Sequence, residues 1–552
     1  MKSILSKSLT CLSVLSLGLS VWSCSDSYMD KINEDTDHTT SVPAKSILAD
    51  VLTSTAVHNV GGDMDTYISS YNEYEVGVYN QLYDTEYRNG TTSSTTFGDS
   101  WNSVYSDLKN ARIIIEKCSD SGSQSGNLTT KGIGEVMAAI NSAIITDNFG
   151  DAPYSQAALP DLKNGIVQYN NPVLDKQKVI YDSIMNYLDA AIKDLPQGDN
   201  NTSGGPGAYD YLYGGSFAKW VKLAYGLKAR YTMRLLPTYS ASEKTAMMDS
   251  VLSYASKSFT STADQAAYNK YGTSNWNPYY DFFISRTYFG ASESYVTKLS
   301  DRNDPRLKRL FVGNDDVQST GLNVKVGTPH YDAKTDVLHV DTIYVAPNGA
   351  PDQAQNEYSF SIYSYAASAP TFYMSYHELL FLEAEAYERL GQTDNAKATL
   401  KEAVVAAIAN TENNITNVED EVDELSNDWG EGVTMSTTAI TTAQAASYFD
   451  NTVAPLFDTN PMKEITVQKY LAFFGPNGEA LEEYADIRRH KALGEDYFSL
   501  LNPHNAKQYP WSLPYGSSGV TSNANVKTAY GDGQYIYTNT IWWAGGTGKA
   551  GN

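Results

Sequence analysis

The sequence predicts a large, mainly helical protein, and three observations indicate this fold class. Apolar residues recur at steps of three and four through most of the chain, which is the spacing of one face of an α-helix. One segment has the residue spacing of a helix–turn–helix repeat. Between about 258 and 370 the periodicity stops, and proline, glycine, asparagine and aromatic residues become frequent. We therefore expect an all-α scaffold with a few short strands and a long irregular, loop-rich region.

The first 23 residues have the pattern of an export signal. A short basic start precedes residues 9–21, an apolar run too short to span a membrane. Cys24 follows Ser20-Val21-Trp22-Ser23, which is typical of a bacterial lipoprotein signal with one bulky residue. The sequence thus predicts removal of residues 1–23, acylation of Cys24 by chains such as palmitate, and membrane attachment through that lipid. An ordinary secretory signal, with Cys24 incidental, is the alternative.

Helical stripes dominate the rest of the chain. Residues 24–45 are polar and lack periodicity, so we expect a tether there, followed by a single domain over 46–552. Helices are expected at 101–115, 136–145, 181–195 and 217–236, and the last of these has Lys222, Lys228, Arg230 and Arg234 near its polar side. Trp101 begins the first of them and is expected to be structural. The alternating run 337–345 predicts a hairpin.

The clearest internal pattern lies at about 374–410. Tyr387, Gly391, Ala396, Leu400 and Ala403 follow one another at steps of 4, 5, 4 and 3. An aromatic residue, a turn glycine and a small residue at the closest helix contact, in this order, are typical of a tetratricopeptide helix pair. The other segments match this pattern less well, so we expect degenerate repeats that form a scaffold and no regular solenoid.

Composition limits the classes of function. The formal net charge of −24 argues against nucleic acid as a partner, because an acidic surface repels phosphates. Apart from Cys24, the mature chain keeps only Cys118, so we expect no disulfide and no cysteine metal site. The chain has 42 Tyr against 16 Phe, and a ring with a polar edge suits a surface that stacks on sugars.

No sequence motif indicates catalysis or a cofactor. His377-Glu378 lacks the second histidine of a zinc protease, and the glycine-rich tail at 545–550 lacks the pattern of a phosphate-binding loop. Asp199 to Asp210 partly resembles a calcium loop, but Asp210 replaces the usual glutamate and Pro206 interrupts the segment, so we expect an ordinary turn and no cofactor, with calcium as the lesser alternative. A glycosidase needs only two carboxylates, and 64 acidic residues leave that possibility open. We expect a binding protein, with a surface glycoside hydrolase as the lesser alternative.

Several segments, taken in order, resemble one known family. They are Cys24, WNSVYSDL at 101–108, DNFGDAPYSQA at 147–157, the segment 219–231, DPRL at 304–307, the helix pair at 376–404, and QKYLAFF at 468–474 followed by DIRR at 486–489. Each is short, but together they are similar to the SusD/RagB family of outer-membrane nutrient-binding lipoproteins, and in particular to its SusD-like branch. The segment 511–516 is a degraded form of the usual C-terminal motif.

The resemblance implies an all-helical fold on tetratricopeptide units, with the irregular, loop-rich region at about 258–370 as the ligand-binding face. It also implies binding of a glycan or oligosaccharide without turnover. It implies a SusC-like TonB-dependent transporter as partner, over which the protein sits as a lid. It also implies lipid anchoring in the outer membrane, on the side that faces the cell exterior. A peptide or glycopeptide ligand, as in the RagB branch, is the alternative. Arg488-Arg489 and Trp542-Trp543 are expected to be structural.

Two aromatic segments are candidates for the ligand site. In the first, at 275–289, we single out Trp276, Tyr279, Tyr280 and Tyr288, which stand among asparagine, aspartate and arginine residues suited to sugar hydroxyls. The alternative is that Asn277-Pro278 is a structural turn whose aromatic neighbours cover the scaffold. The second segment contains Tyr83, Tyr87, Arg88 and Asn89, just before the first long helix.

Overall fold

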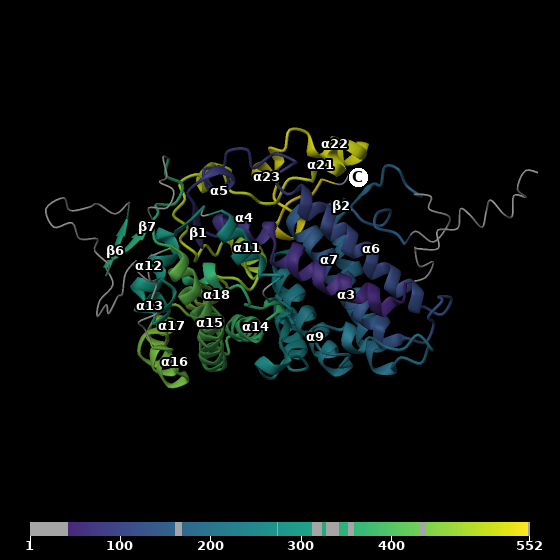
Figure 1. Cartoon of the computed structure of the whole chain (residues 1–552), viewed down its shortest axis with the longest axis horizontal. Helices are drawn as coiled ribbons and strands as arrows, with labels where there is room; N and C mark the ends of the chain where they lie inside the picture. The colour runs from purple at the N-terminus through teal and green to yellow at the C-terminus, as the bar shows by residue number, and fades with distance from the viewer. Residues whose placement is uncertain are drawn as a thin grey trace, which may run out of the picture. The chain divides into compact units, whose positions relative to one another are not determined.

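Helices dominate the computed structural model, so the all-α fold class is confirmed (Figure 1). The structure describes residues 42–160, 168–272, 274–286, 288–311, 323–326, 342–351, 358–429 and 438–549. The predicted export signal, Cys24 and nearly all of the predicted tether lie outside these residues. No helix among the described residues combines the length and the apolar character needed to cross a membrane.

The first half of the chain forms a layer of packed helices. They are α3 (Ala44–Ser54), the π-helix η1 (Thr55–Val60), α4 (Asp63–Tyr71), α5 (Asn80–Glu86), α6 (Gly98–Cys118), α7 (Leu128–Phe149), α8 (Gln177–Asp194), η2 (Leu195–Gln197), η3 (Gly207–Tyr209), α9 (Phe217–Arg234), η4 (Leu236–Thr238), α10 (Ala241–Ala255) and η5 (Thr262–Asp264). The four expected long helices correspond to α6, α7, α8 and α9. Helix α7 packs against both α6 and α8 and is buried on nearly every side, which its small and apolar residues allow.

The second half begins with short helices, continues with longer scaffold helices and ends with short C-terminal helices. In order, these helices are α11 (Pro278–Ser285), α12 (Glu293–Asp301), α13 (Arg306–Leu310), η6 (Ile362–Tyr365), α14 (Tyr376–Arg389), α15 (Thr393–Trp429), α16 (Thr442–Tyr448), η7 (Phe449–Val453), α17 (Ala454–Thr459), α18 (Pro461–Ala472), α19 (Ala480–Leu493), α20 (Asn505–Gln508), α21 (Ser517–Ser522), α22 (Ala524–Tyr530), α23 (Tyr535–Thr538) and η8 (Trp542–Ala544).

The tetratricopeptide-type helix pair is confirmed as α14 and α15. Gly391 ends the first helix at φ +70°, a left-handed conformation that glycine adopts without steric cost. Its N–H donates to Glu388 O, and the N–H of Gln392 donates to Tyr387 O, which is the Schellman arrangement. Ala396, Leu400 and Ala403, which the sequence pattern placed at the helix contact, are fully buried there.

Four two-stranded ribbons complete the fold of the described residues. Antiparallel pairs join β1 (Glu75–Gly77) to β5 (Phe289–Ala291), β2 (Ala152–Pro153) to β3 (Leu174–Asp175), and β4 (Ala266–Tyr268) to β8 (Thr371–Met374). The fourth pairs β6 (Asn323–Val326) with β7 (Thr342–Val345) in parallel. The hairpin predicted at 337–345 is therefore corrected within the described residues: 342–345 is a strand, but its partner lies further away and runs in the same direction.

The region predicted to be irregular contains helices α11, α12 and α13. Asn277 starts α11 because its side chain accepts the N–H of Tyr279, and Pro278 supplies a first helical residue that needs no N–H partner. Ser292 caps α12 in the same way. Because these capping residues start helices, the region predicted as one long loop contains short helices, and their side chains have fixed positions.

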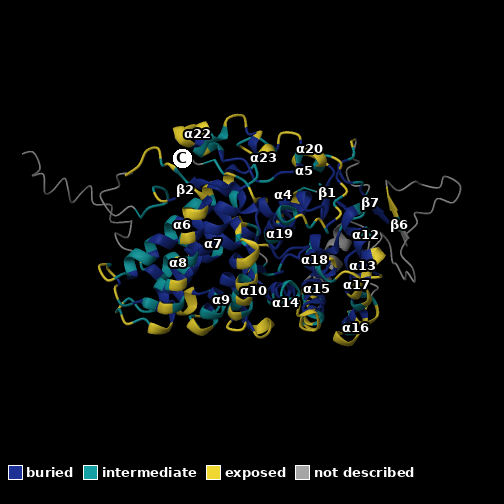
Figure 2. Cartoon of the chain, turned by 180° about the vertical axis from the view of Figure 1, so that it is seen from behind, coloured by how far each residue is buried: buried dark blue, intermediate teal, exposed yellow. Residues whose placement is uncertain are grey.

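Buried residues run through the inner helices (Figure 2). They include charged groups as well as apolar ones. The prediction that Lys228, Arg230 and Arg234 lie on the polar side of α9 was wrong, because all three are buried and pair with acidic residues of other segments. Arg489 is buried against Glu385 and Asp486, so its predicted structural role is confirmed. Arg488 is buried too, but it donates to backbone carbonyls, including Asp147 O.

The predicted structural tryptophans also lie in this core. Trp543 is fully buried, and its indole N–H donates to Asp147 at 2.9 Å. Trp101 is buried between Phe149 and Tyr515, as its place at the start of a predicted helix suggested.

Candidate ligand-binding site

An open hollow lies where η1, α4, α6 and α11 meet. Its volume is about 510 Å³, within the range of small-molecule binding sites. Figure 1 shows α4 and α11 beside each other at the centre of the view. The π-helix η1 contributes Val57 and His58 to its wall, and such segments often occur at functional sites. This hollow is the candidate site that the described residues support best.

Trp276 stands at the rim of the hollow with 41% of its surface exposed. Its ring packs edge-on against Tyr280, with the ring centroids 5.5 Å apart. The next residue, Asn277, is held in place, because its side-chain amide donates to Ala369 O and Pro476 O. The large apolar face of Trp276 is therefore exposed on a fixed backbone, as a stacking platform for a sugar requires.

Three carboxylates line the hollow together with one guanidinium. Asp63, Asp99 and Asp281 are exposed there, and none forms an ion pair or a side-chain hydrogen bond with another described residue. The guanidinium of Arg286 lies 5.0 Å from the ring centroid of Phe282 and donates to Ser285 Oγ. The site thus combines an aromatic face with unpaired hydrogen-bond acceptors.

The charged side chains that line the hollow shift the pKa of Asp63. Partial burial raises the pKa of Asp63, and the carboxylates of Asp99 and Asp281 raise it further. The cationic groups of Arg286 and His58 oppose this rise in pKa. These five side chains come from three distant parts of the sequence, so the fold brings them within electrostatic reach of one another.

The other aromatic residues singled out in the segment 275–289 are less accessible. Tyr279 is 2% exposed and stacks on Phe289 with the centroids 5.7 Å apart, so its ring offers no free face. Tyr280 is buried and supports Trp276. Tyr288 is half-buried and packs against Tyr79, an exposed residue that the sequence pattern did not single out.

The second candidate segment does not line the hollow. Tyr83 and Tyr87 are half-buried and stack in parallel, with the centroids 5.7 Å apart. Arg88 is buried, sits at φ +63° just after α5, and donates to Thr85 O and Asn505 Oδ1, which gives it a structural position. Asn89 is exposed. The stacked tyrosines thus form a separate aromatic surface.

The residues of the hollow that come from the N-terminal part of the chain were not predicted from the sequence. His58, Asp63 and Asp99 occur singly and follow no motif, and they are more than 170 residues from Trp276 in the chain. The one signal in the sequence was that Asp63 and Asp99 stand at the starts of helical stripes, where acidic residues are common for structural reasons.

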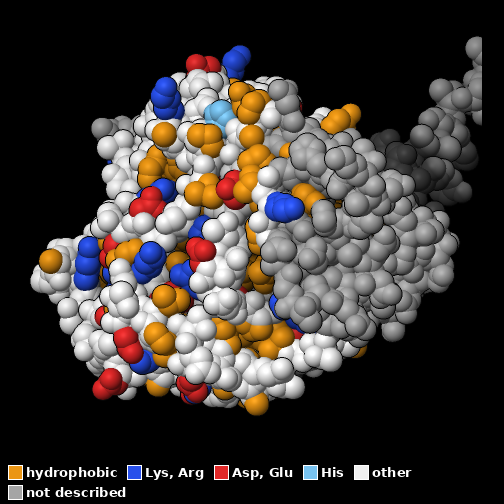
Figure 3. Space-filling model, turned by 90° about the vertical axis from the view of Figure 1, so that its left-hand side faces the viewer, with side chains coloured by type: hydrophobic (Ala, Val, Ile, Leu, Met, Phe, Trp, Pro, Cys, Tyr) orange, Lys and Arg blue, Asp and Glu red, His pale blue; other side chains and the backbone are white. Residues whose placement is uncertain are grey.

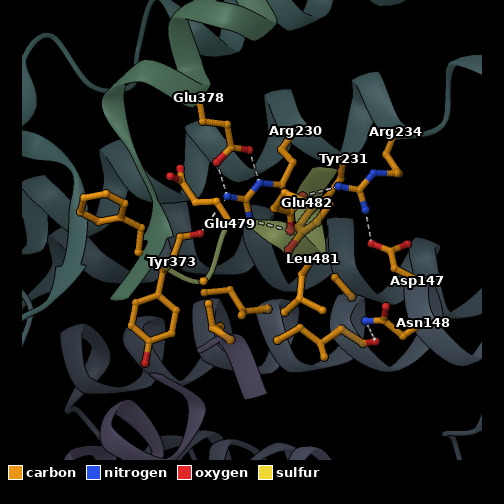
Figure 4. A pocket seen from close by; sticks show the side chains of 16 residues that line it. Asp147, Asn148, Arg230, Tyr231, Arg234, Tyr373, Glu378, Glu479, Leu481 and Glu482 are labelled. Atoms are coloured by element: carbon orange, nitrogen blue, oxygen red, sulfur yellow. Dashed lines mark hydrogen bonds and ion pairs between the residues drawn. The ribbon is translucent and has the colours of Figure 1, made fainter. Parts of the chain in front are cut away.

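A smaller, enclosed cavity of about 30 Å³ lies deeper in the scaffold (Figure 4). Arg230 and Arg234 face Glu378, Glu482 and Asp147 across it, and each charge has an opposite charge beside it. The volume suits a water molecule and no sugar. We therefore assign this cavity to the structural ion-pair network.

The segment that partly resembles a calcium loop holds its carboxylates in hydrogen bonds, most of them to backbone N–H groups. Asp199 accepts the N–H of Thr130, and Asp210 accepts three backbone N–H groups and the indole N–H of Trp220. Among the described residues no group of three or more His, Cys, Asp or Glu side chains is placed to hold a metal ion. These two aspartates stabilise turns.

No large apolar docking surface lies on the described part of the face shown in Figure 3. On the face in Figure 3, the hydrophobic side chains of the described part form several groups that polar and charged side chains separate. A large continuous apolar patch would indicate a docking surface, and scattered groups do not.

Comparisons with known proteins show which family this chain and its fold resemble. A SusD-like family model, described as "Starch-binding associating with outer membrane", matches residues 34–491. A SusD/RagB family protein from Bacteroides thetaiotaomicron has 46% identity and a TM-score of 0.81, over 92% of this chain and all of that one. Comparison with curated proteins gave no match.

Two more distant structures share the fold. A chitin-binding protein is 21% identical, with a TM-score of 0.64 over 90% of this chain and 100% of that one. A chitin-binding SusD homologue from Flavobacterium johnsoniae is 16% identical, with a TM-score of 0.61 over 91% and 98%. Since the family model spans most of its length and a solved member is 46% identical to it, the chain belongs to the SusD-like family.

Proposed function

We propose that this protein binds a saccharide at the hollow beside Trp276 and does not turn it over. The observation that supports this most is the exposed ring of Trp276 at the rim of a hollow with unpaired carboxylates, in a chain of a family described as starch-binding. The C–H face of a sugar stacks on such a ring, while its hydroxyls donate to carboxylate oxygens. Binding without turnover is the role expected from the family.

We also propose that acylated Cys24 anchors the protein to the outer membrane, facing the exterior, where it passes its ligand to a SusC-like TonB-dependent transporter. The family description, "associating with outer membrane", and the sequence pattern that predicts an export signal support this. A Cys24→Ala variant should leave the membrane fraction, and the tagged wild-type protein should co-purify with a TonB-dependent barrel. Retention of the variant in the outer membrane would contradict the lipid anchor.

Calorimetry tests the binding site. A panel of neutral, amine-bearing and acidic oligosaccharides, with oligopeptides alongside, is titrated into the domain that starts after Cys24. Trp276→Ala should weaken binding of the best saccharide about tenfold through loss of stacking. Tyr209→Ala is the matched control, because Tyr209 is 42% exposed but does not line the hollow. Binding of peptides alone would favour the RagB-like alternative, and release of reducing ends would favour the hydrolase.

A further inference from the structure

The carboxylates of the hollow have no partner in the described part of the chain, whereas several exposed acids elsewhere are paired. Asp450 pairs with Lys401 and Asp458 with Lys397, each at 2.7 Å. Asp99 and Asp281 have no such partner among the described residues. Their oxygens are therefore free to accept hydrogen bonds from a bound molecule.

The one guanidinium at the hollow does not neutralise these acids. Arg286 packs over the ring of Phe282 and bonds to Ser285 Oγ, and it forms no ion pair with a described carboxylate. Three carboxylates line the hollow with one guanidinium and one imidazole. The hollow is thus negative overall.

Ser100 provides a second, independent sign that the hollow takes a polar ligand. It is 4% exposed, lines the hollow, and its hydroxyl forms no hydrogen bond to another described residue. Because Ser100 lies on the wall of the hollow, its hydroxyl can form a hydrogen bond with a molecule bound there. Asn102 and Ser103, from the following turn of α6, line the same wall.

Asp63 is repelled by the other two carboxylates. Burial raises its pKa most, Asp99 and Asp281 raise it further, and Arg286 and His58 oppose this rise. A positive charge between them would relieve this repulsion, and a further negative charge would increase it.

We infer that the saccharide bound beside Trp276 carries a protonated amine, and that acidic saccharides such as uronate or sulfated oligomers are excluded. This inference rests on the proposed saccharide-binding function and specifies its substrate class. An ammonium group has three donors and no acceptor, which complements carboxylates that can only accept. The ring of Trp276 stacks on the sugar, the carboxylates bind its amine, and the hydroxyl of Ser100 bonds to a sugar hydroxyl.

Calorimetry with ligands matched in length tests this inference. The probes are a glucosamine tetramer with free amines, its fully N-acetylated counterpart, and a galacturonate tetramer. We expect the free-amine tetramer to bind about tenfold more tightly than the acetylated one, the size of one charge-assisted hydrogen bond. We expect no measurable binding of the galacturonate. The preference should shrink as salt is raised, because salt screens exposed charges.

Variants at the hollow show whether the preference for the amine comes from the carboxylates there or from the net charge of the protein. Asp99→Asn and Asp281→Asn should each reduce the preference for the free amine several-fold, because they weaken binding of the free-amine tetramer more than binding of the acetylated one. Asp182→Asn removes one negative charge from the exposed face of α8, far from the hollow in sequence, and should change neither affinity. A preference unaltered by both hollow variants would overturn the inference.

The outcomes distinguish this inference from the function on which it rests. Binding of the acetylated tetramer as tightly as the free amine, with loss in Trp276→Ala, overturns the amine preference and keeps saccharide binding. Tighter binding of the galacturonate, or of a lysine-containing tetrapeptide of equal charge, also overturns it. Absence of binding by every saccharide would reject the proposed function itself.

Discussion

Arg230 donates two hydrogen bonds to the carboxylate of Glu378, at 2.6 and 2.5 Å, and thereby joins α9 to α14 (Figure 4). The two residues are 148 positions apart, and both are buried. The two parallel bonds use the planar fork of arginine, which a lysine could not reproduce. This pair connects the tetratricopeptide-type helix pair to the N-terminal helical layer, so it supports the scaffold on which the binding site is built.

Removal of Glu378 should destabilise the fold strongly. Glu378→Ala leaves the buried Arg230 with only Glu482, at 3.3 Å, as an anionic partner. The expected loss in the free energy of unfolding is about 3–5 kcal/mol, because an uncompensated buried charge is costly. Urea denaturation at pH 7 measures it. Asp450→Ala breaks the exposed pair with Lys401 and should cost less than about 1 kcal/mol. Equal losses in both variants would contradict this account.

The turn of the helix pair gives a second prediction. Gly391 has φ +70° and open space where a side chain would begin, so a substitution there meets backbone strain without a clash. Gly391→Ala should lower the free energy of unfolding by about 1–2 kcal/mol. Gly391→Asn should cost less, because asparagine tolerates the left-handed conformation. Thermal unfolding of both variants compares them, and identical losses would mean that strain is not the cause.

The helix pair was predictable because its signal is local. Tyr387, Gly391, Ala396 and their neighbours lie within one short segment, and their spacing reflects contacts made within that segment. The ionic core was not predictable in this way. On a helical wheel Arg230 and Arg234 belong with the polar residues, and their burial depends on Glu378, Glu482 and Asp147, which come from other segments.

The same distinction applies to the candidate site. Trp276 stood out because tryptophan beside Asn277-Pro278, outside a helical stripe, is typical of an exposed turn. The burial of Tyr279 could not be read from that segment, because it depends on packing against Phe289 after the chain has turned back as β5. Asp63 and Asp99 became site residues only through the meeting of α4, α6 and α11.

Stability should fall as the pH rises toward 8, partly because of Glu75. Burial raises the pKa of Glu75 from 4.5 to about 8, against the opposing effect of the Tyr279 hydroxyl. Its carboxyl oxygens are buried without a hydrogen-bond partner among the described residues. Between these two pKa values the folded protein keeps a proton that the unfolded chain releases. The stabilising contribution is therefore complete below pH 4.5 and is lost as the pH rises through 8.

Glu75→Gln isolates this effect, because the amide cannot ionise. Relative to the wild type, the variant should gain stability as the pH is raised from 5 to 8, by up to about 1.4 kcal/mol per pH unit. Urea denaturation at several pH values measures the slope. Asp182→Asn, in an exposed pair with Lys178, is the control and should leave the slope as it is. Parallel stability curves for the wild type and Glu75→Gln would show that Glu75 is ionised in the folded protein.

The stacked pair of Tyr83 and Tyr87 should extend the binding surface for long ligands. Both rings are half-buried, and Tyr87 also packs edge-on against His504 at 4.4 Å between centroids. Because neither tyrosine lines the hollow, a short saccharide beside Trp276 should not need them. Tyr87→Ala should therefore weaken binding of a long oligosaccharide about threefold to tenfold and leave a disaccharide unaffected. Trp276→Ala should weaken binding of both ligands.

Tyr87→Phe keeps the ring and removes only the hydroxyl, so it separates stacking from hydrogen bonding at this surface. If stacking is the cause, this variant should bind the long oligosaccharide as the wild type does. Its thermal midpoint, measured beside that of Tyr87→Ala, shows whether loss of the contact with His504 has altered the fold instead. Full affinity of Tyr87→Ala for long ligands would assign the stacked pair to packing, and Trp276 would remain as the aromatic contact of the site.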